Sequence, residues 1–200
     1  MLSSEKSQNA EGLLAEDHEE LDKLLRALLR ALDEGDAATA FARLDLLWAR
    51  LAMHIRAENL HLFPTILKAV DDNLGEREDK ILSSAEACET INKLRTDHDF
   101  FMHQLASAVK IMREVLATNS RNSKARLDDV RQIISAVNER LKWHNRVEEE
   151  LVYGLPASLL EPAEEAALEV QILGELENLP PRFSDTAAMG KVLSERYDSR

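Results

Sequence analysis

The amino-acid sequence predicts an all-α protein, an antiparallel up-down-up-down four-helix bundle with an extra C-terminal helix and tail. Helix breakers are scarce, since the 200 residues include only five prolines and six glycines, and good helix formers are plentiful. Apolar residues recur at i, i+3, i+4 and i+7 in several stretches, which is the spacing of a buried helical face. No stretch shows the alternation typical of strands, so we expect no sheet.

The first two helices are expected at residues 10–33 and 37–71, with the sequence DEGDA between them. Pro64 falls inside the second of these ranges and is expected to disturb it, because proline has no N–H to donate to the helix. The apolar stripes of the two helices agree with this assignment. They consist of Leu21, Leu24, Leu25, Leu28, Leu29 and Leu32 in the first, and Leu44, Leu47, Trp48, Leu51 and Ile55 in the second.

The second pair of helices is expected at residues 79–118 and 125–153. The turn DDNLGERED precedes this pair, the polar loop TNSRNSK separates its two helices, and YGLP ends the second of them. A fifth helix is expected at 162–177, followed by a proline-containing tail. We therefore predict a bundle domain over residues 1–156 and a C-terminal helix and tail over 157–200. Short links between four long helices are typical of an antiparallel bundle.

The composition excludes several classes of protein. The net charge of −12 argues against a general affinity for nucleic acid or anionic lipid. No apolar run reaches the roughly 18 residues that a membrane span needs, and the first residues lack the apolar core of a secretory signal. Cys88 is the only cysteine, so neither an internal disulfide nor a cysteine-based zinc site is expected. These features favour a cytoplasmic protein, and the extra helix is compatible with a homodimer.

The histidines follow a pattern that occurs twice. Residues 54–64 read HIRAENLHLFP, and residues 144–156 read HNRVEEELVYGLP. Each phrase begins His-x-Arg-x-Glu, has an aromatic residue five positions after the Glu, and ends in proline. One helix earlier in each half a further histidine follows an aspartate, in EDHEEL and TDHDFF. The first two helices therefore look like a rough copy of the next two, in which His18 corresponds to His98.

The pattern suits a metal site. A His and a Glu four residues apart on a helix differ by about 40° around its axis and about 6 Å along it, so both reach one region. That region is the apolar face, where a carboxylate without a partner is very costly. Six ligands that include two carboxylates suit two iron or manganese ions better than one tetrahedral zinc. The candidate ligands are His18, His54, Glu58, His98, His144 and Glu148.

Two other histidines are additional candidates. His61 lies seven residues after His54, near the same face but about 10 Å along the axis. His103 lies five residues after His98, which turns it about 140° away on an ideal helix, so it would need a local bulge to bind. His61 also completes a Glu-x-x-His spacing with Glu58, as in ferritin-like sites, but no other histidine has a glutamate three positions before it.

Other residues have mainly structural interpretations. The aromatic residues, including Trp143, are expected in the core, with Phe63 and Tyr153 at equivalent places in the two halves and capping the metal pocket. Asp17 and Asp97 precede histidines that they cannot face, because adjacent helical residues point apart. A carboxylate from a neighbouring helix is nevertheless expected to orient a ligand imidazole, as metal-bound histidines usually require.

Taken together, the residues His18, HIRAE, His98 and HNRVE resemble the hemerythrin-like HHE cation-binding domain, over about residues 10–156. The resemblance implies a non-haem di-iron centre with carboxylate and oxo bridges. It implies that His18 and His54 hold one iron, that His98 and His144 hold the other, and that Glu58 and Glu148 bridge them. Oxygen carriers of this family have a further histidine four residues after the first histidine of the third helix, where this chain has Met102.

The expected function is a binding protein in which iron takes up dioxygen or nitric oxide, or is itself the cargo, for sensing, buffering or a stress response. Manganese or zinc would accept the same ligands. One alternative is an oxidase-like or peroxidase-like enzyme at this site, because a missing histidine leaves coordination positions open. Another is a helical interaction module with a vestigial site, in which the repeated phrase reflects packing alone.

Overall fold

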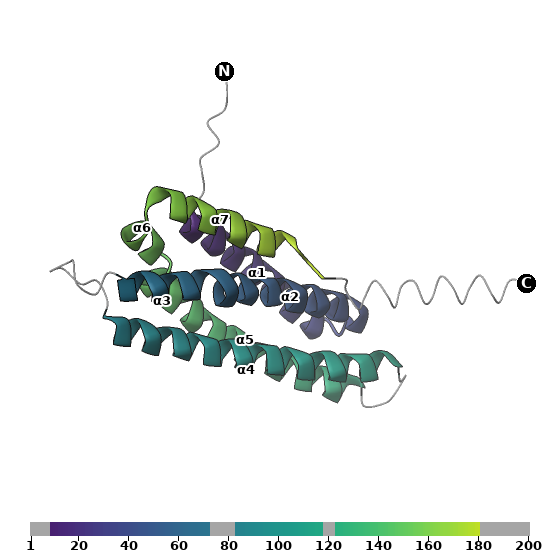
Figure 1. Ribbon diagram of the computed structural model, residues 1–200. Helices are drawn as coiled ribbons and strands as arrows, with labels where there is room; N and C mark the ends of the chain where they lie inside the picture. Colours follow the sequence, from purple (N-terminus) through teal and green to yellow (C-terminus); the bar gives the residue numbers. More distant parts are fainter. Residues whose placement is uncertain (1–8, 73–82, 118–122, 181–200) are drawn as a thin grey trace, which may run out of the picture. The chain divides into compact units, whose positions relative to one another are not determined.

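A computed structural model describes residues 9–72, 83–117 and 123–180, and every regular element in these ranges is helical (Figure 1). The predicted all-α bundle with an extra C-terminal helix is thereby confirmed. The turn expected after residue 72, most of the loop near residue 120 and the tail beyond residue 180 lie outside the described residues. The elements are α1 Ala10–Asp33, α2 Ala37–Ala57, η1 Glu58–Leu62, α3 Phe63–Asp72, α4 Ser84–Ala117, α5 Ser123–Leu151, α6 Leu155–Leu159 and α7 Pro162–Glu177.

Local sequence explains where several helices begin and end. Gly35 follows α1 with φ +73°, a left-handed conformation that glycine adopts without steric cost. Asp36 then caps α2, since its side chain accepts the backbone N–H of Thr39 at 3.0 Å. At the start of α7 the side chain of Glu161 and that of Glu164 each accept the other's backbone N–H. These caps determine helix ends that lie within a few residues of the predicted ones.

The helix expected at 37–71 contains a wide turn. Its middle segment η1 is a π-helix, in which the N–H of Phe63 donates to the carbonyl of Glu58, five residues back. Pro64 follows immediately and cannot donate to the carbonyl four residues before it, which removes a bond of the regular α pattern. The expected disturbance is therefore a π-helical turn that begins at one of the predicted metal ligands.

The described chain forms two compact units, each made of parts of several helices. Of the described residues, unit 1 comprises 9–20, 53–72, 83–100 and 139–178, and unit 2 comprises 21–52, 101–117, 123–138 and 179–180. Unit 2 has an apolar interior from α1, α2, α4 and α5, and an ion pair between Asp33 and Arg131. Its fully buried large side chains include Leu21, Leu25, Leu28, Leu44, Leu47, Leu51 and Phe101.

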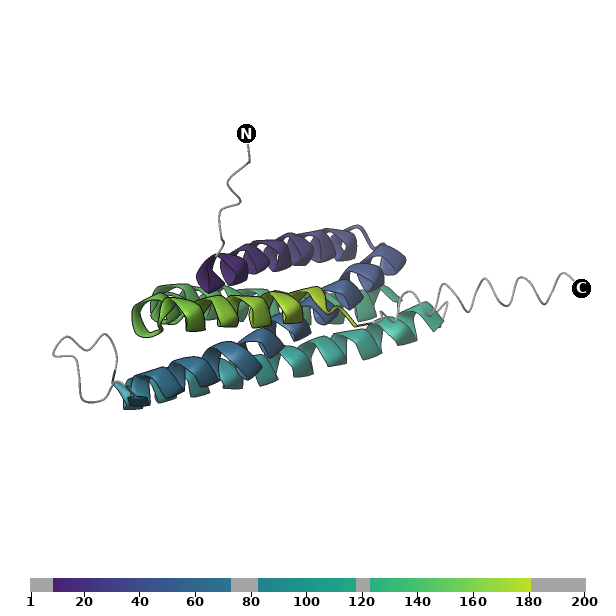
Figure 2. The ribbon, with the colours of Figure 1, turned by 45° about the horizontal axis from the view of Figure 1, so that its top comes forward.

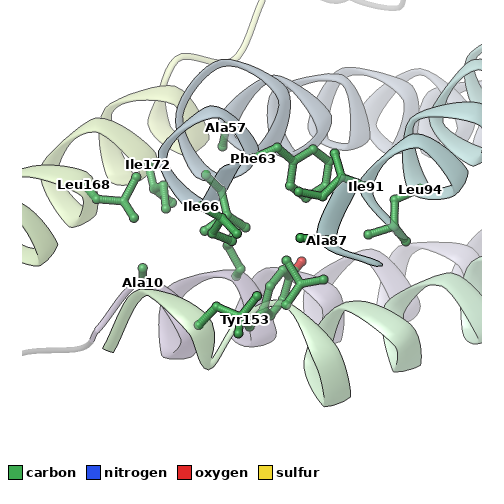
Figure 3. Packing of buried hydrophobic residues seen from close by; sticks show 14 of the residues in the cluster. Ala10, Ala57, Phe63, Ile66, Ala87, Ile91, Leu94, Tyr153, Leu168 and Ile172 are labelled. Atoms are coloured by element: carbon green, nitrogen blue, oxygen red, sulfur yellow. The ribbon is translucent and has the colours of Figure 1, made fainter. Parts of the chain in front are cut away.

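Unit 1 has an apolar cluster in which several elements meet (Figure 3). The chain reverses at α6, so that α7 runs back antiparallel to the end of α5 (Figures 1 and 2). The apolar face of α7 is thereby buried, with Leu168 and Ile172 at 2% and 0% exposure. Trp143 corrects the sequence-based expectation, because it is 68% exposed and the guanidinium of Arg146 lies 5.6 Å from its ring centre. None of the described helices combines the length and the apolar character that crossing a membrane requires.

Candidate metal centre

The six residues predicted as metal ligands lie together inside unit 1. They come from α1, α2, η1, α4 and α5, and each is at most 4% exposed. Within the described residues, their nitrogen and oxygen atoms form two groups that could each hold an ion. One group contains Glu58, His98, His144 and Glu148, and the other contains His18, His54 and Glu148. We call the surroundings of His18 and His54 the first half-site, and those of His98 and His144 the second half-site.

Each carboxylate directs its two oxygens to different half-sites. Oε1 of Glu58 lies 3.5 Å from Nε2 of His54, and its Oε2 lies 3.2 Å from Nε2 of His98. Oε2 of Glu148 lies 3.3 Å from Nε2 of His18, and its Oε1 lies 2.9 Å from Nε2 of His144. Carboxylates in this arrangement are placed to bridge two cations.

The imidazoles face one another in pairs. Nε2 of His18 lies 3.1 Å from Nε2 of His54, and Nε2 of His98 lies 3.1 Å from Nε2 of His144. Two nitrogen lone pairs cannot face each other stably at this distance, so each pair must share either a proton or a metal ion. The paired nitrogens are the atoms that bind a metal when the other ring nitrogen is held by a hydrogen bond.

The outer nitrogens of the imidazoles have partners that follow the repeat. Nδ1 of His54 lies 3.0 Å from Asp17, and Nδ1 of His144 lies 3.3 Å from Asp97. In each half, the aspartate that precedes the first histidine therefore orients the imidazole of the second histidine, on the following helix. Asp97 is itself held by Arg140 at 2.7 Å. The expectation that a carboxylate from a neighbouring helix orients a ligand imidazole therefore agrees with the structure.

A second set of outer partners was missed in the sequence. Nδ1 of His18 lies 2.8 Å from Oε1 of Glu149, and Nδ1 of His98 lies 3.2 Å from the side-chain amide of Asn59. Glu149 and Asn59 each follow a predicted carboxylate ligand by one position, so the alignment of the two halves contained the signal. The amide oxygen of Asn59 accepts a hydrogen bond from Nε of Arg95 at 3.3 Å.

The charges of the cluster are balanced by protons when metal is absent. Burial alone lowers the pKa of His144, but the charge of Glu148 and the hydrogen bond to Asp97 outweigh burial and raise the pKa to about 9. Burial likewise opposes the charged form of His54, yet Glu58 and Asp17 hold its pKa well above the ordinary value. Burial also raises the pKa of Glu148, but the charge and hydrogen bond of His144, together with hydrogen bonds from His18 and His98, lower that pKa well below the ordinary value. These shifts favour ionised carboxylates at Glu58 and Glu148 and protonated imidazoles at His54 and His144.

The donor atoms fit a metal better than they fit one another. Oε2 of Glu58 and Oε1 of Glu148 are buried and accept no hydrogen bond of suitable angle from the described part of the chain, although imidazole nitrogens lie 3.2 and 2.9 Å away. Buried carboxylate oxygens without hydrogen bonds are costly. Four imidazole nitrogens and four carboxylate oxygens that converge in this way could hold metal cations.

Wide backbone turns bring two aromatic residues into the centre. The N–H of Tyr153 donates to the carbonyl of Glu148 at 2.9 Å, as the N–H of Phe63 does to Glu58, in both cases across five residues. On an ideal α-helix a residue five positions on points about 140° away, and the wide turn brings it back toward the ligand face. Phe63 stacks on His98 with ring centres 5.9 Å apart, and Tyr153 stacks on His18 at 5.4 Å. Both residues occupy the places expected of them as caps of the pocket.

The two additional candidate histidines lie outside both groups of described donor atoms. His61 is partly exposed, and its Nε2 lies 3.6 Å from Glu175 of α7, which also pairs with Arg56. His103 is exposed at the surface of unit 2.

The fold and the cluster define a helical protein with buried histidine and carboxylate side chains arranged to hold cations. Residues 10–155 match the family described as Hemerythrin HHE cation binding domain. This match covers most of the chain, so the chain belongs to that family. No curated protein and no solved structure matches the chain significantly. The helix α7 lies beyond the matched residues.

Proposed function

We propose that this chain binds two iron ions in the buried cluster and uses them to bind a small ligand such as dioxygen or nitric oxide. His18 and His54 would hold one ion, His98 and His144 the other, and the two glutamates would bridge them. The observation that carries the proposal is the division of each carboxylate between the two half-sites. Manganese or zinc would compete for the same ligands, and a cluster of nitrogen and carboxylate donors favours iron or manganese over tetrahedral zinc.

The chain itself contributes position, charge and exclusion of water. Asp17, Asp97 and Glu149 hold the outer ring nitrogens, which leaves the facing nitrogens free to bind a cation. Glu58 and Glu148 supply two negative charges at full burial. Cations that enter the cluster would displace the protons of the imidazoles, and these protons would leave to solvent. Bound iron would supply open coordination positions and a change of oxidation state. Such positions would support a binding role in sensing or buffering.

The test is the metal content and absorption spectrum of the full chain purified without oxygen and then supplied with ferrous iron and air. The wild type is expected to hold two irons per chain and to show the near-ultraviolet absorption of an oxo bridge. Glu58→Gln with Glu148→Gln removes both bridging charges with little change in shape and is expected to lose iron and absorption. Glu150→Gln is the matched control, because Glu150 is an exposed glutamate of the same helix paired with Arg146.

A wild type that holds almost no metal after iron is supplied would refute the proposal. Equal iron content in the double variant and the control would also refute it, since the ligands would then lie elsewhere. Where two irons are found, titration with nitric oxide under anaerobic conditions tests small-ligand binding. Unchanged spectra at saturating nitric oxide would contradict that part of the proposal.

A further inference from the structure

The two half-sites differ in one side chain that reaches their centre. Tyr153 and Phe63 occupy equivalent positions, five residues after a bridging glutamate, and each stacks on the imidazole of the other half. Only Tyr153 carries an oxygen. An oxygen donor is therefore present in the first half-site and absent at the matching place in the second.

The hydroxyl of Tyr153 lies among the donor atoms of the first half-site. It donates a hydrogen bond to Oε1 of Glu58 at 2.7 Å and lies 3.3 Å from Oε2 of Glu148. It also lies 3.0 Å from Nε2 of His18 and 3.4 Å from Nε2 of His54. The phenol oxygen therefore contacts all four donor groups that would surround a cation bound there. The side chain is only 1% exposed, so the hydroxyl lies in the buried interior together with these groups.

Packing alone does not account for this position. A buried tyrosine needs one hydrogen-bond partner, and Glu58 already provides it. Phe63 shows that the same wide turn can place a plain ring against an imidazole without a hydroxyl group. The remaining contacts of the hydroxyl are with Oε2 of Glu148 and the facing nitrogens of His18 and His54, which are the atoms that converge on a cation.

We propose that Tyr153 is a further metal ligand, a phenolate that binds the ion of the first half-site and leaves the open position in the second half-site beside Phe63. This inference rests on the proposed function, since it requires metal in the cluster. When the ion enters, a bond forms between it and the phenol oxygen, the phenol O–H bond breaks, and the proton leaves to solvent. The negative charge of the phenolate then adds to that of the two carboxylates.

The experiment uses iron as the probe and the full chain. Ferric iron bound to a phenolate gives a charge-transfer band in the visible and resonance-enhanced ring vibrations, which neither imidazole nor carboxylate ligands produce. The chain has two tyrosines, Tyr153 and Tyr197, so such a band must come from one of them. The iron-loaded wild type and Tyr197→Phe are expected to show the band and the vibrations. Tyr153→Phe is expected to lose both while it still binds iron.

The outcomes separate this inference from the proposed function. A wild type with two irons and no visible phenolate band would overturn the inference and leave the proposed function intact. A wild type without iron would overturn both. A band that disappears in Tyr197→Phe would also overturn the assignment. If Tyr153→Phe does not fold by circular dichroism, the band of Tyr197→Phe decides the question alone, because Tyr153 is then the only tyrosine in the chain.

Discussion

The stability of the metal-free protein should fall as the pH rises from about 6.5 to about 9. The pKa of His144 rises from 6.5 to about 9 on folding, because Glu148 and Asp97 outweigh the effect of burial. A group whose pKa is raised in the folded state contributes stability that is fully present at pH values below its unfolded pKa. This contribution is lost as the pH rises through the folded pKa. The shift of this single group corresponds to about 3 kcal/mol of unfolding free energy. His54 and His98 shift in the same direction, so they act with the same sign.

The assay is denaturant unfolding of chelator-treated protein at several pH values and constant ionic strength. Glu148→Gln removes the charge that most favours protonated His144, and it is expected to reduce the fall of the unfolding free energy with rising pH. Glu150→Gln is the matched control and is expected to keep the wild-type slope, because Glu150 lies at the surface. A free energy of unfolding that stays constant or rises over this pH range would refute the reasoning.

The same groups predict the opposite trend for metal binding. A metal ion that enters the cluster would displace protons from His54, His98 and His144, so metal affinity should rise over the pH range in which the metal-free protein loses stability. At a free metal concentration of roughly 100 times Kd, binding would add about 3 kcal/mol of stability. Metal affinity measured by chelator competition that falls with rising pH would contradict the assignment of these imidazoles as ligands.

Two further predictions concern the packing of α7 and the outer partners of the imidazoles. Ile172→Ala empties a fully buried site and should lower the unfolding free energy by about 2–5 kcal/mol, whereas Val170→Ala, at 72% exposure, should change it by less than about 0.5 kcal/mol. Equal effects in denaturant melts would show that α7 does not pack as described. Asp17→Asn removes the carboxylate that holds Nδ1 of His54 and should weaken metal binding roughly 10- to 100-fold with little loss of helix by circular dichroism. An unchanged metal affinity would mean that this contact does not orient the imidazole.

The helices could be predicted from the sequence because their signals are local. Apolar spacing, rare prolines and clear turns determine where each helix begins and ends to within a few residues. The π-helical turn after Ala57 could not be predicted in form, because Pro64 removes a donor without specifying how the chain responds. The surface on which α7 packs could not be predicted for another reason: a short amphipathic segment can cover several different apolar surfaces, and only tertiary structure selects one.

The convergence of the six predicted ligands could be predicted because the His-x-x-x-Glu spacing fixes relative direction on one helix. The direction of the Tyr153 side chain could not be predicted, because a residue five positions after Glu148 on a regular helix would point away from the ligands. Its hydroxyl reaches them through a turn in which its own N–H bonds to the carbonyl of Glu148. Glu149 and Asn59 were overlooked since a residue next to a ligand usually faces elsewhere. In this bundle each contacts an imidazole from another helix instead.

The two halves of the sequence match at the predicted ligands but differ at two neighbouring positions. Both differences place the more electron-rich group at the first half-site. In the first half-site the outer partner of His18 is the carboxylate of Glu149, and the stacked ring is the phenol of Tyr153. In the second half-site the matching groups are the amide of Asn59, held by the cation Arg95, and the plain ring of Phe63. Electron-rich groups therefore gather at one half-site, where they would favour a more highly charged ion. Two ions that share the same predicted ligands but differ in the contact with Tyr153 would be suited to different tasks, one fixed in place and one open to an incoming ligand.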